Sequence, residues 1–316
     1  MITTSATTNE RRKRHVIFDF DWTMIDANTD LFIYEQLNPD LLRQITERAS
    51  EIQWTELMQS SIESLLQTRR ITEVEQCLIK CPFAPEMISI LQQLNNSATI
   101  SPYTATAEPL SLGEKDNSGD DWGENEVSIV SDANRFFIDT ILRHHGAHDL
   151  VHGVYTNAAM VHTESNSVRL TQFCTHIQLP HQCSTCPVNM CKGEIVQRLR
   201  HGHYHLLNSR ACTPSDLSGT VVVMVDNVTD GSQTFTSQNK ENGEEQETPS
   251  PQVIYVGDGS NDFCAAKQLT IGDYLFVRRG FRLEKLIAEG GHEQLQCQIE
   301  YWTDWKDLLQ LFQTHR

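Results

Sequence analysis

Short apolar runs alternate with amphipathic stretches over much of the chain. Four runs have the length and the β-branched and aromatic content of buried strands, at residues 16–18, 127–130, 253–256 and 274–277. Helical spacing of apolar residues is clear at 135–144 and 192–200, between the second run and the third. Strands that alternate with helices in this order predict an α/β fold with an open, mostly parallel sheet.

Residues 31–98 have a different pattern. Strand-like runs are missing from this stretch, and apolar residues recur at helical spacing at Leu41, Ile45, Ile52, Leu57, Ile62, Leu65 and Leu66. The pattern predicts a helical cap inserted into the α/β core, so that residues 15–30 and 127–316 form the core. The apolar run 221–225 indicates an extra strand or hairpin whose place in the fold stays open.

Three polar segments complete the predicted organisation. Residues 1–14 end in the basic cluster 11–14 and are expected to form a disordered tail, with a nuclear address as the alternative. Residues 99–126 form a predicted acidic insertion, and a polar insertion is expected at about 201–251. We expect both insertions to be solvated surface loops.

Composition narrows the classes of partner. The 316 residues are 39% hydrophobic, which suffices for one core and a smaller accessory domain. Lysine and arginine number 25 against 42 aspartates and glutamates, so the net charge of −17 disfavours nucleic acid and anionic membranes as partners. The absence of a signal-like or membrane-length apolar run and the odd count of nine cysteines favour a cytoplasmic protein with free thiols. The oligomeric state stays open.

Acidic residues follow two of the predicted strands. Asp19 and Asp21 come directly after 16–18, and Asp258 and Asp262 follow 253–256 within a turn rich in glycine. Like charges this close repel one another unless a cation lies between them, and Mg²⁺ prefers oxygen ligands. The pattern therefore predicts a magnesium site, with a turn merely rich in aspartate as the alternative for the first pair.

Two further residues supply groups that bind phosphate. Ser131 follows the run 127–130 and offers a hydroxyl donor, whereas Lys192 begins a predicted helix and offers a fixed positive charge. Each is a common residue type by itself. Their order along the chain, together with the acidic pairs, is much more specific than any single match.

These residues resemble the four motifs of the haloacid dehalogenase-like phosphatase superfamily: Asp19-x-Asp21-x-Thr23, Ser131, Lys192 and Gly257-Asp258-Gly259-x-x-Asp262. Three more stretches narrow the resemblance to the phosphoethanolamine/phosphocholine phosphatase family: Ile25-Asp26-x-Asn28-x-Asp30, Ser131-Asp132-Ala133-Asn134 and Cys183-x-x-Cys186-Pro187-x-Asn189-Met190-Cys191-Lys192. That family includes phosphatases of pyridoxal phosphate and plant members that act on pyrophosphate or thiamine monophosphate. The resemblance implies a Rossmann-like core with an inserted cap.

The resemblance also implies a set of catalytic roles. Asp19 would be the nucleophile that forms an aspartyl-phosphate, and Asp21 the general acid and then the general base. Ser131 and Lys192 would bind the phosphoryl oxygens. Mg²⁺ would be held by the carboxylate of Asp19, the backbone carbonyl of Asp21 and the carboxylate of Asp258. Asp262 would support the metal directly or through water.

Substrate preference would depend on Asp30 and Asp132, which match family positions that contact substrate. Two carboxylates favour a cationic group, so the expected substrate is a small phosphorylated metabolite, phosphoethanolamine or phosphocholine. Pyridoxal phosphate, thiamine monophosphate and pyrophosphate are the alternatives, as is phosphoryl transfer to an alcohol at the same site. A cap for the helix that opens at Leu31 is the structural alternative for Asp30. A non-catalytic binding protein with a phosphatase fold is disfavoured, because a site without activity has no physical reason to retain so many carboxylates that repel one another.

The chain departs from the family in two loops and in one long segment. Ala158 and Ala265 stand where relatives usually have proline, and the path 199–251 is longer than in relatives. The cysteines at 183, 186 and 191 have zinc-like spacing but form only one CxxC pair. We therefore favour a metal-free thiol loop that positions Lys192, with a structural zinc site as the alternative.

Overall fold

The structure is a computed structural model that describes residues 13–95, 125–177, 181–202, 222–223 and 250–315. The predicted tail, apart from its last two residues, lies outside the described residues. So do nearly all of the predicted acidic insertion 99–126 and most of the polar insertion 201–251.

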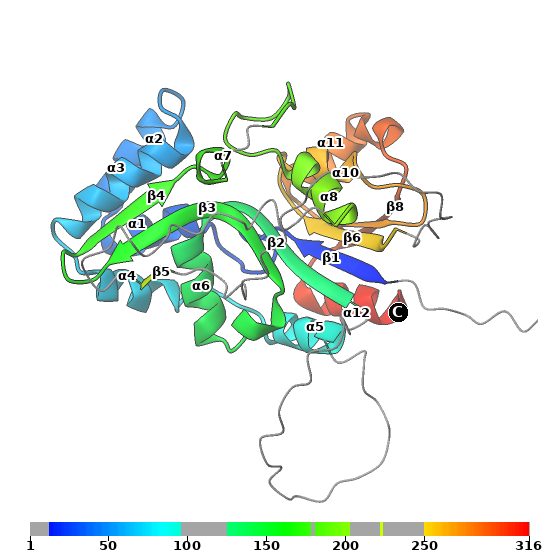
Figure 1. Ribbon diagram of the computed structural model, residues 1–316, viewed down its shortest axis with the longest axis horizontal. Coiled ribbons are helices and arrows are strands. Elements are labelled where there is room, and N and C mark those ends of the chain that lie inside the picture. Colours follow the sequence, from blue (N-terminus) through cyan, green and yellow to red (C-terminus); the bar gives the residue numbers. More distant parts are fainter. Residues whose placement is uncertain (1–12, 96–124, 178–180, 203–221, 224–249, 316) are drawn as a thin grey trace, which may run out of the picture.

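The strands form one sheet in the order β4-β3-β2-β1-β6-β7-β8, with β5 paired to β3 (Figure 1). Their bounds are β1 Arg14–Phe18, β2 Asn125–Asn134, β3 Gly153–His162, β4 Ser167–Thr171, β5 Val222–Val223, β6 Gln252–Gly257, β7 Tyr274–Arg278 and β8 Gln298–Trp302. Every neighbouring pair from β3 to β8 is parallel, and β4 and β5 run antiparallel to β3. The predicted α/β fold with a mostly parallel sheet is confirmed.

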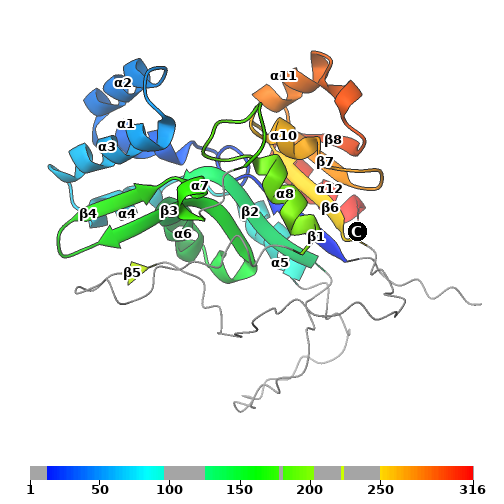
Figure 2. The same ribbon diagram turned by 45° about the horizontal axis from the view of Figure 1, so that its top comes forward.

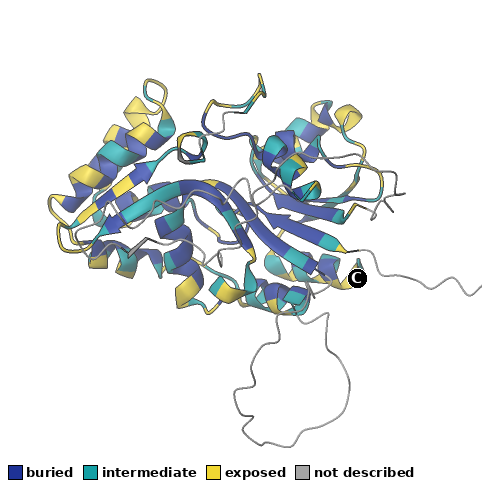
Figure 3. Ribbon diagram, viewed as in Figure 1, coloured by how far each residue is buried: buried dark blue, intermediate teal, exposed yellow. Residues whose placement is uncertain are grey.

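Both faces of the sheet are buried, because side chains alternate along each strand. Val16 and Phe18 of β1 belong to one apolar cluster, and Ile17 between them belongs to the other. In Figures 1 and 3 the helices α5, α6 and α12 lie on one side of the sheet and α8, α10 and α11 on the other. Their bounds are α5 Pro85–Asn95, α6 Arg135–His144, α8 Lys192–Arg200, α10 Asp262–Ala266, α11 Arg282–Ala288 and α12 Trp305–Thr314.

Four helices form a group at the β4 end of the sheet (Figure 2). They are α1 Thr29–Leu37, α2 Pro39–Arg48, α3 Trp54–Leu66 and α4 Ile71–Leu78. The side chain of Asn28 accepts a hydrogen bond from the backbone N–H of Leu31 and so caps α1, and Asn38 caps α2 in the same way. Asp30 lies inside the first turn of α1, so Asn28 and not Asp30 is the N-cap.

The helix α5 belongs to the core layer although it falls within the stretch 31–98. It contacts α12 and β2, and its buried side chains include Ile90 and Leu91. The cap helices therefore end before α5. The reason is that the apolar face of α5 completes the cover on one side of the sheet, which a helical period alone does not reveal.

A hairpin of β3 and β4 reaches from the sheet to the cap. The first half of β3 pairs with β2, and the second half of β3 pairs with β4. Strand β4 in turn contacts α3. The strand predicted within 221–225 exists at Val222–Val223 and pairs with Met160 and Val161 of β3. The short helix α7 Phe173–His176 follows β4. Among the helices that the structure describes, none has the length and apolar character needed to cross a membrane.

Candidate active site

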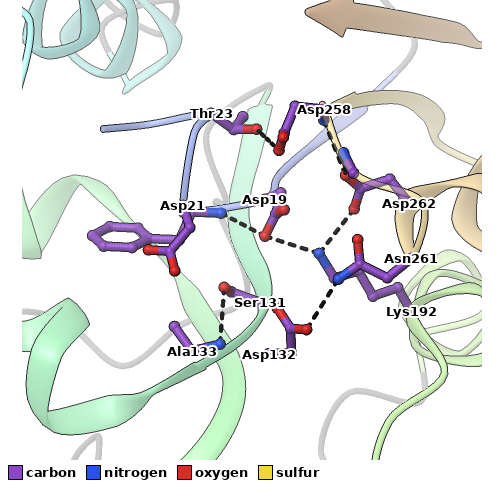
Figure 4. A network of polar contacts seen from close by, with 12 residues as sticks. Asp19, Asp21, Thr23, Ser131, Asp132, Ala133, Lys192, Asp258, Asn261 and Asp262 are labelled. Atoms are coloured by element: carbon purple, nitrogen blue, oxygen red, sulfur yellow. Dashed lines mark hydrogen bonds and ion pairs between the residues drawn. The ribbon is translucent and has the colours of Figure 1, made fainter. Parts of the chain in front are cut away.

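The sheet brings the predicted motifs to one edge. Phe18, the last residue of β1, pairs with Ile129 of β2 and Val256 of β6, so the residues beyond these positions share the carboxyl edge. Asp19 follows β1 and Asp258 follows β6, and Figure 4 shows both at the same edge of the sheet as Ser131 of β2. The chain leaves β1 toward β2 on one side, and β6 lies on the other, which makes this edge a topological switch point.

Lys192 joins the site from a helix on one face of the sheet. It is the first residue of α8 and its side chain is 1% exposed. Its Nζ lies 2.9 Å from Asp19 Oδ1 and 2.8 Å from Asp262 Oδ1. Burial alone would lower the pKa of Lys192, but the two facing carboxylates outweigh burial and raise the pKa above its ordinary value. The ammonium is therefore charged at neutral pH.

The carboxylate of Asp262 accepts four hydrogen bonds within the site. One of its oxygens accepts hydrogen bonds from Lys192 and from the Tyr255 hydroxyl, at 2.8 and 2.7 Å. The other accepts the backbone N–H groups of Asp258 and Gly259, at 3.0 and 2.8 Å. Because both oxygens already have two donors, Asp262 is built to orient Lys192 and the turn that carries Asp258.

Asp19 keeps one oxygen available. Its Oδ1 accepts the backbone N–H of Phe20 and contacts Lys192, whereas Oδ2 has no hydrogen-bond donor among the described residues. Burial raises the pKa of Asp19 well above its ordinary value, and the carboxylates of Asp262 and Asp258 add to the shift that Lys192 opposes.

The carboxylates of Asp19, Asp258 and Asp262 are buried, and one oxygen of each lies within 4.8 Å of the others. Burial and the neighbouring Asp262 raise the pKa of Asp258 to about 7. Three carboxylates face one ammonium here, so a divalent cation with oxygen ligands would balance the charge. The residues therefore fit Mg²⁺. Among the described residues, the side chain of Asp258 has a single donor, the Thr23 hydroxyl at 3.2 Å, fewer than Asp19 or Asp262 has.

Asp21 lies on the loop that leaves β1, close to the start of α1. Its Oδ2 accepts a hydrogen bond from the Thr29 hydroxyl at 3.2 Å, and its buried Oδ1 has no partner among the described residues. Burial and then the nearby Asp30 raise the pKa of Asp21 well above its ordinary value. A carboxyl group held in its protonated form can donate a proton, which is the requirement for a general acid.

Arg278 fixes this loop and was not foreseen from the sequence. The buried guanidinium at the end of β7 donates to the Trp22 carbonyl at 2.6 Å and to Asp26 Oδ1 at 2.8 Å. It also lies over the rings of Trp302 and Trp305. No local motif marks this arginine; only the pairing of β7 with β6 brings it beneath the first loop.

Ser131 and Asp132 occupy an irregular part of β2. The pairing of β2 with β3 shifts register between Val130 and Asn134. Ser131 is fully buried and its Oγ accepts the backbone N–H of Ala133 at 3.3 Å. Asp132 is exposed and accepts a hydrogen bond from the Asn261 side chain at 3.2 Å. The irregularity turns two successive residues toward the site edge.

Asp30 lines a narrow pocket between the cap and the sheet that has no room for a water molecule in this structure. The indole N–H of Trp54 donates to Asp30 Oδ2 at 2.7 Å, and burial raises the pKa of Asp30 to about 7. The side chains around it come from α1, α3, β2, β3 and β4: Asp30, Trp54, Thr55, Met58, Ala133, Asn134, Asn157 and Leu170. Asp30 is the ionisable side chain among these described residues. Trp54 was missed because nothing in its local sequence distinguishes it from a core aromatic.

The chain matches the model of a known protein family. Residues 14–101, 120–209 and 233–315 match the family described as Putative Phosphatase. The chain belongs to this family. It is a phosphatase and a phosphoric monoester hydrolase.

Several curated relatives of this phosphatase align over most of both chains. Thiamine phosphate phosphatase-like protein of Arabidopsis thaliana is 25% identical over 95% of each chain. Inorganic pyrophosphatase 1 of the same plant is 26% identical over 92% of this chain and 75% of its own. Pyridoxal phosphate phosphatase PHOSPHO2 of Homo sapiens is 23% identical over 93% and 95%. A substrate-bound phosphoserine phosphatase structure aligns with a TM-score of 0.49 at 15% identity, over 96% of this chain and 99% of that one.

Proposed function

We propose that this phosphatase hydrolyses phosphoethanolamine or phosphocholine through an aspartyl-phosphate on Asp19, with Mg²⁺ as cofactor. The observation that carries the substrate class is the pocket around Asp30, whose ionisable group is a carboxylate. The geometry of Asp19, Asp21 and Lys192 supports the reaction type.

The first step transfers the phosphoryl group to the enzyme. An Asp19 carboxylate oxygen attacks phosphorus and forms an acyl phosphate, while the bond from phosphorus to the alcohol oxygen breaks. Asp21 gives its proton to the departing alkoxide. Its raised pKa suits this role, and such acid catalysis contributes about 10²–10⁴-fold.

The second step returns the enzyme to its starting state. Asp21, now a carboxylate, takes a proton from water as the water oxygen attacks phosphorus. The bond from phosphorus to Asp19 breaks, and inorganic phosphate leaves. Asp21 is protonated again at the end, so protons and charges balance over the cycle.

Lys192 and Ser131 bind the phosphoryl oxygens, and Mg²⁺ would be held by Asp19, Asp258 and the backbone carbonyl of Asp21. When bound, the ion supplies positive charge that stabilises the phosphoryl oxygens in the transition state. Asp262 supports Lys192 and the Asp258 turn through its four hydrogen bonds. Lys192 contacts Asp19 directly, which brings the nucleophile and the phosphate site together.

The cap pocket favours a cationic leaving group. An ammonium near Asp30 gains a charge-assisted contact with the carboxylate. A second phosphate in the same place would face Asp30 and the nearby Asp132, with no basic side chain among the described pocket residues. Pyrophosphate is therefore the weaker candidate.

A panel of phosphomonoesters tests the proposal. We expect kcat/KM for phosphoethanolamine and phosphocholine to exceed that for pyridoxal phosphate, thiamine monophosphate and pyrophosphate by about tenfold or more. The preference should grow as pH rises through about 7, because the pKa of Asp30 is raised to about 7 and the ionised form attracts the ammonium. An equal or reversed preference would refute the substrate class and leave the phosphatase assignment intact.

The variant Asp30→Asn separates charge from shape. It should lower kcat/KM for phosphoethanolamine by about tenfold while it leaves kcat/KM for para-nitrophenyl phosphate, which has no ammonium, nearly unchanged. Trp54→Phe is the matched control: it keeps an aromatic side chain and removes the N–H donor to Asp30. A parallel loss for both substrates in Asp30→Asn would mean that Asp30 has no part in substrate choice.

A further inference from the structure

A second cluster of ligand atoms lies next to the phosphatase site and consists of sulfur. Cys183 and Cys186 lie in the loop before α8, Cys191 is the N-cap of α8, and Cys264 is in α10. One sulfur of each lies within 4.8 Å of all the others. Cys264 completes the set from a distant part of the chain, and the CxxC spacing of the loop gives no hint of it.

The separations fit tetrahedral coordination. Sulfurs bound to Zn²⁺ at about 2.3 Å lie about 3.8 Å from one another at the corners of a tetrahedron. Cys264 Sγ is 3.8 Å from Cys183 Sγ and 3.5 Å from Cys191 Sγ. A disulfide needs a sulfur separation of about 2.05 Å and joins only two residues. Here one sulfur approaches two others at once, which a shared metal ion explains and a single disulfide does not.

Helix α8 supplies a backbone donor to one of the sulfurs. The backbone N–H of Glu194 donates to Cys191 Sγ at 3.4 Å, and this N–H lies at the positive end of the α8 dipole. Cys191 and Cys264 are buried, and Cys183 and Cys186 are half-buried, so the site closes on the protein side and opens toward solvent only through the loop. With four sulfur ligands, no coordination position is left for substrate.

We propose that Cys183, Cys186, Cys191 and Cys264 bind one Zn²⁺ as a structural site that joins α8 to α10. Binding releases the protons of the thiols and leaves a site with a net charge of −2 when all four are thiolates. This site is separate from the carboxylate cluster and does not depend on the proposed substrate.

The sulfur cluster lies beside the contact between Lys192 and Asp262. Cys191 immediately precedes Lys192, and Cys264 is two residues after Asp262. The two charged residues contact each other at 2.8 Å, so an ion held by their neighbours fixes that contact. A side chain at Gly193 would lie only 2.5 Å from the Cys264 carbonyl, which shows how closely α8 approaches α10 at this point.

Metal analysis of the full-length protein purified without chelator tests the site. We expect about one zinc per chain and four sulfur neighbours at about 2.3 Å by X-ray absorption spectroscopy. Cobalt exchanged into the site should give the sulfur-to-metal charge-transfer bands of tetrahedral thiolate coordination. Zinc below about one tenth per chain, together with four cysteines that react freely with an alkylating agent after unfolding, would overturn the proposal, as would a nitrogen or oxygen shell around the zinc.

Single substitutions assign the ligands. Cys264→Ser and Cys186→Ser should lower the zinc content to well below half, whereas Cys297→Ser, a half-buried cysteine outside the cluster, should keep it. Removing zinc with a strong chelator should lower Tm by at least about 5 °C, with recovery on Zn²⁺ but not on Mg²⁺. If a variant does not fold, the absorption spectrum of the unmodified protein still decides, and full zinc content in Cys264→Ser would remove that residue from the site.

Discussion

The carboxylate cluster and the thiol cluster both depend on helices α8 and α10, but they are assembled in different ways. Asp19 and Asp258 meet because parallel strands end at one edge of the sheet. Cys191 and Cys264 meet because α8 packs closely on α10. The oxygen ligands suit a hard ion that takes part in the reaction, and the sulfur ligands suit an ion that stays in place. The order of the strands brings the carboxylates together, and the packing of α8 on α10 brings the cysteines together.

The largest expected effect comes from Asp19→Asn, which changes only the carboxylate cluster. The variant lacks the nucleophile, so kcat should fall by at least about 10⁴-fold, while zinc content stays unchanged. Steady-state phosphate release measures the first quantity and elemental analysis the second. Asp149→Asn, whose side chain is 99% exposed, is the matched control. Retention of more than about a tenth of the activity would show that the nucleophile is another residue.

Lys192→Met tests the link between the two clusters. It leaves Asp19 and Asp262 buried and facing each other without the ammonium, which should cost about 3–5 kcal/mol of unfolding free energy. Urea denaturation in the absence of Mg²⁺ measures this loss. Saturating Mg²⁺ should recover part of it, since the ion supplies charge to the same carboxylates. A loss below about 1 kcal/mol would contradict the assigned ion pairs.

Asp30 lies outside both clusters and carries a pH dependence of stability. Burial raises its pKa from 3.8 to about 7, so the folded state binds this proton more tightly than the unfolded state. Stability due to Asp30 is then present at low pH and is lost as pH rises from about 4 to 7. Asp30→Asn should remove this loss and gain up to about 4 kcal/mol on wild type above pH 7.

Urea denaturation of both proteins from acid to mildly basic pH checks this prediction. Asp40→Asn, an exposed position on the first turn of α2, is the control and should follow wild type throughout. If the Asp30→Asn and wild-type curves stay parallel, the Asp30 carboxyl is not buried as the contacts with Trp54 indicate.

The smallest effect is expected for Thr23→Val, which removes the hydroxyl that donates to Asp258 Oδ1. Losing a hydrogen bond to a charged group costs about 1.5 kcal/mol, so the Mg²⁺ concentration for half-maximal activity should rise about tenfold. Magnesium titration of the rate measures this change, and zinc content should not respond. Thr140→Val on α6 is the control; a similar shift there would show that the effect is not local.

The sequence was most informative where the backbone pattern decides the structure. The apolar runs at 16–18 and 253–256 locate β1 and β6, and their parallel pairing alone places Asp19 beside Asp258. Helix α8 begins and ends where its pattern predicts, at Lys192 and Arg200. These features are local in sequence or follow from the general geometry of parallel sheets.

The features that escaped the sequence depend on contacts between distant segments. Cys264 reaches the thiols only through the α8–α10 packing, and Trp54 reaches Asp30 only through the fold of the cap. Arg278 holds the first loop from β7, more than two hundred residues away. The hairpin of β3 and β4 was not foreseen because β4 is only five residues long and β3 has polar residues among its apolar ones.

Chemical trapping of the phosphoenzyme tests the central claim most directly. Borohydride reduces an acyl phosphate to an alcohol, so wild type quenched during turnover with phosphoethanolamine and Mg²⁺ should contain homoserine at residue 19. Mass spectrometry of the peptide that carries residues 14–30 detects it, and Asp19→Asn should show none. Homoserine at Asp21 or Asp258, or none at all during steady turnover, would contradict the account.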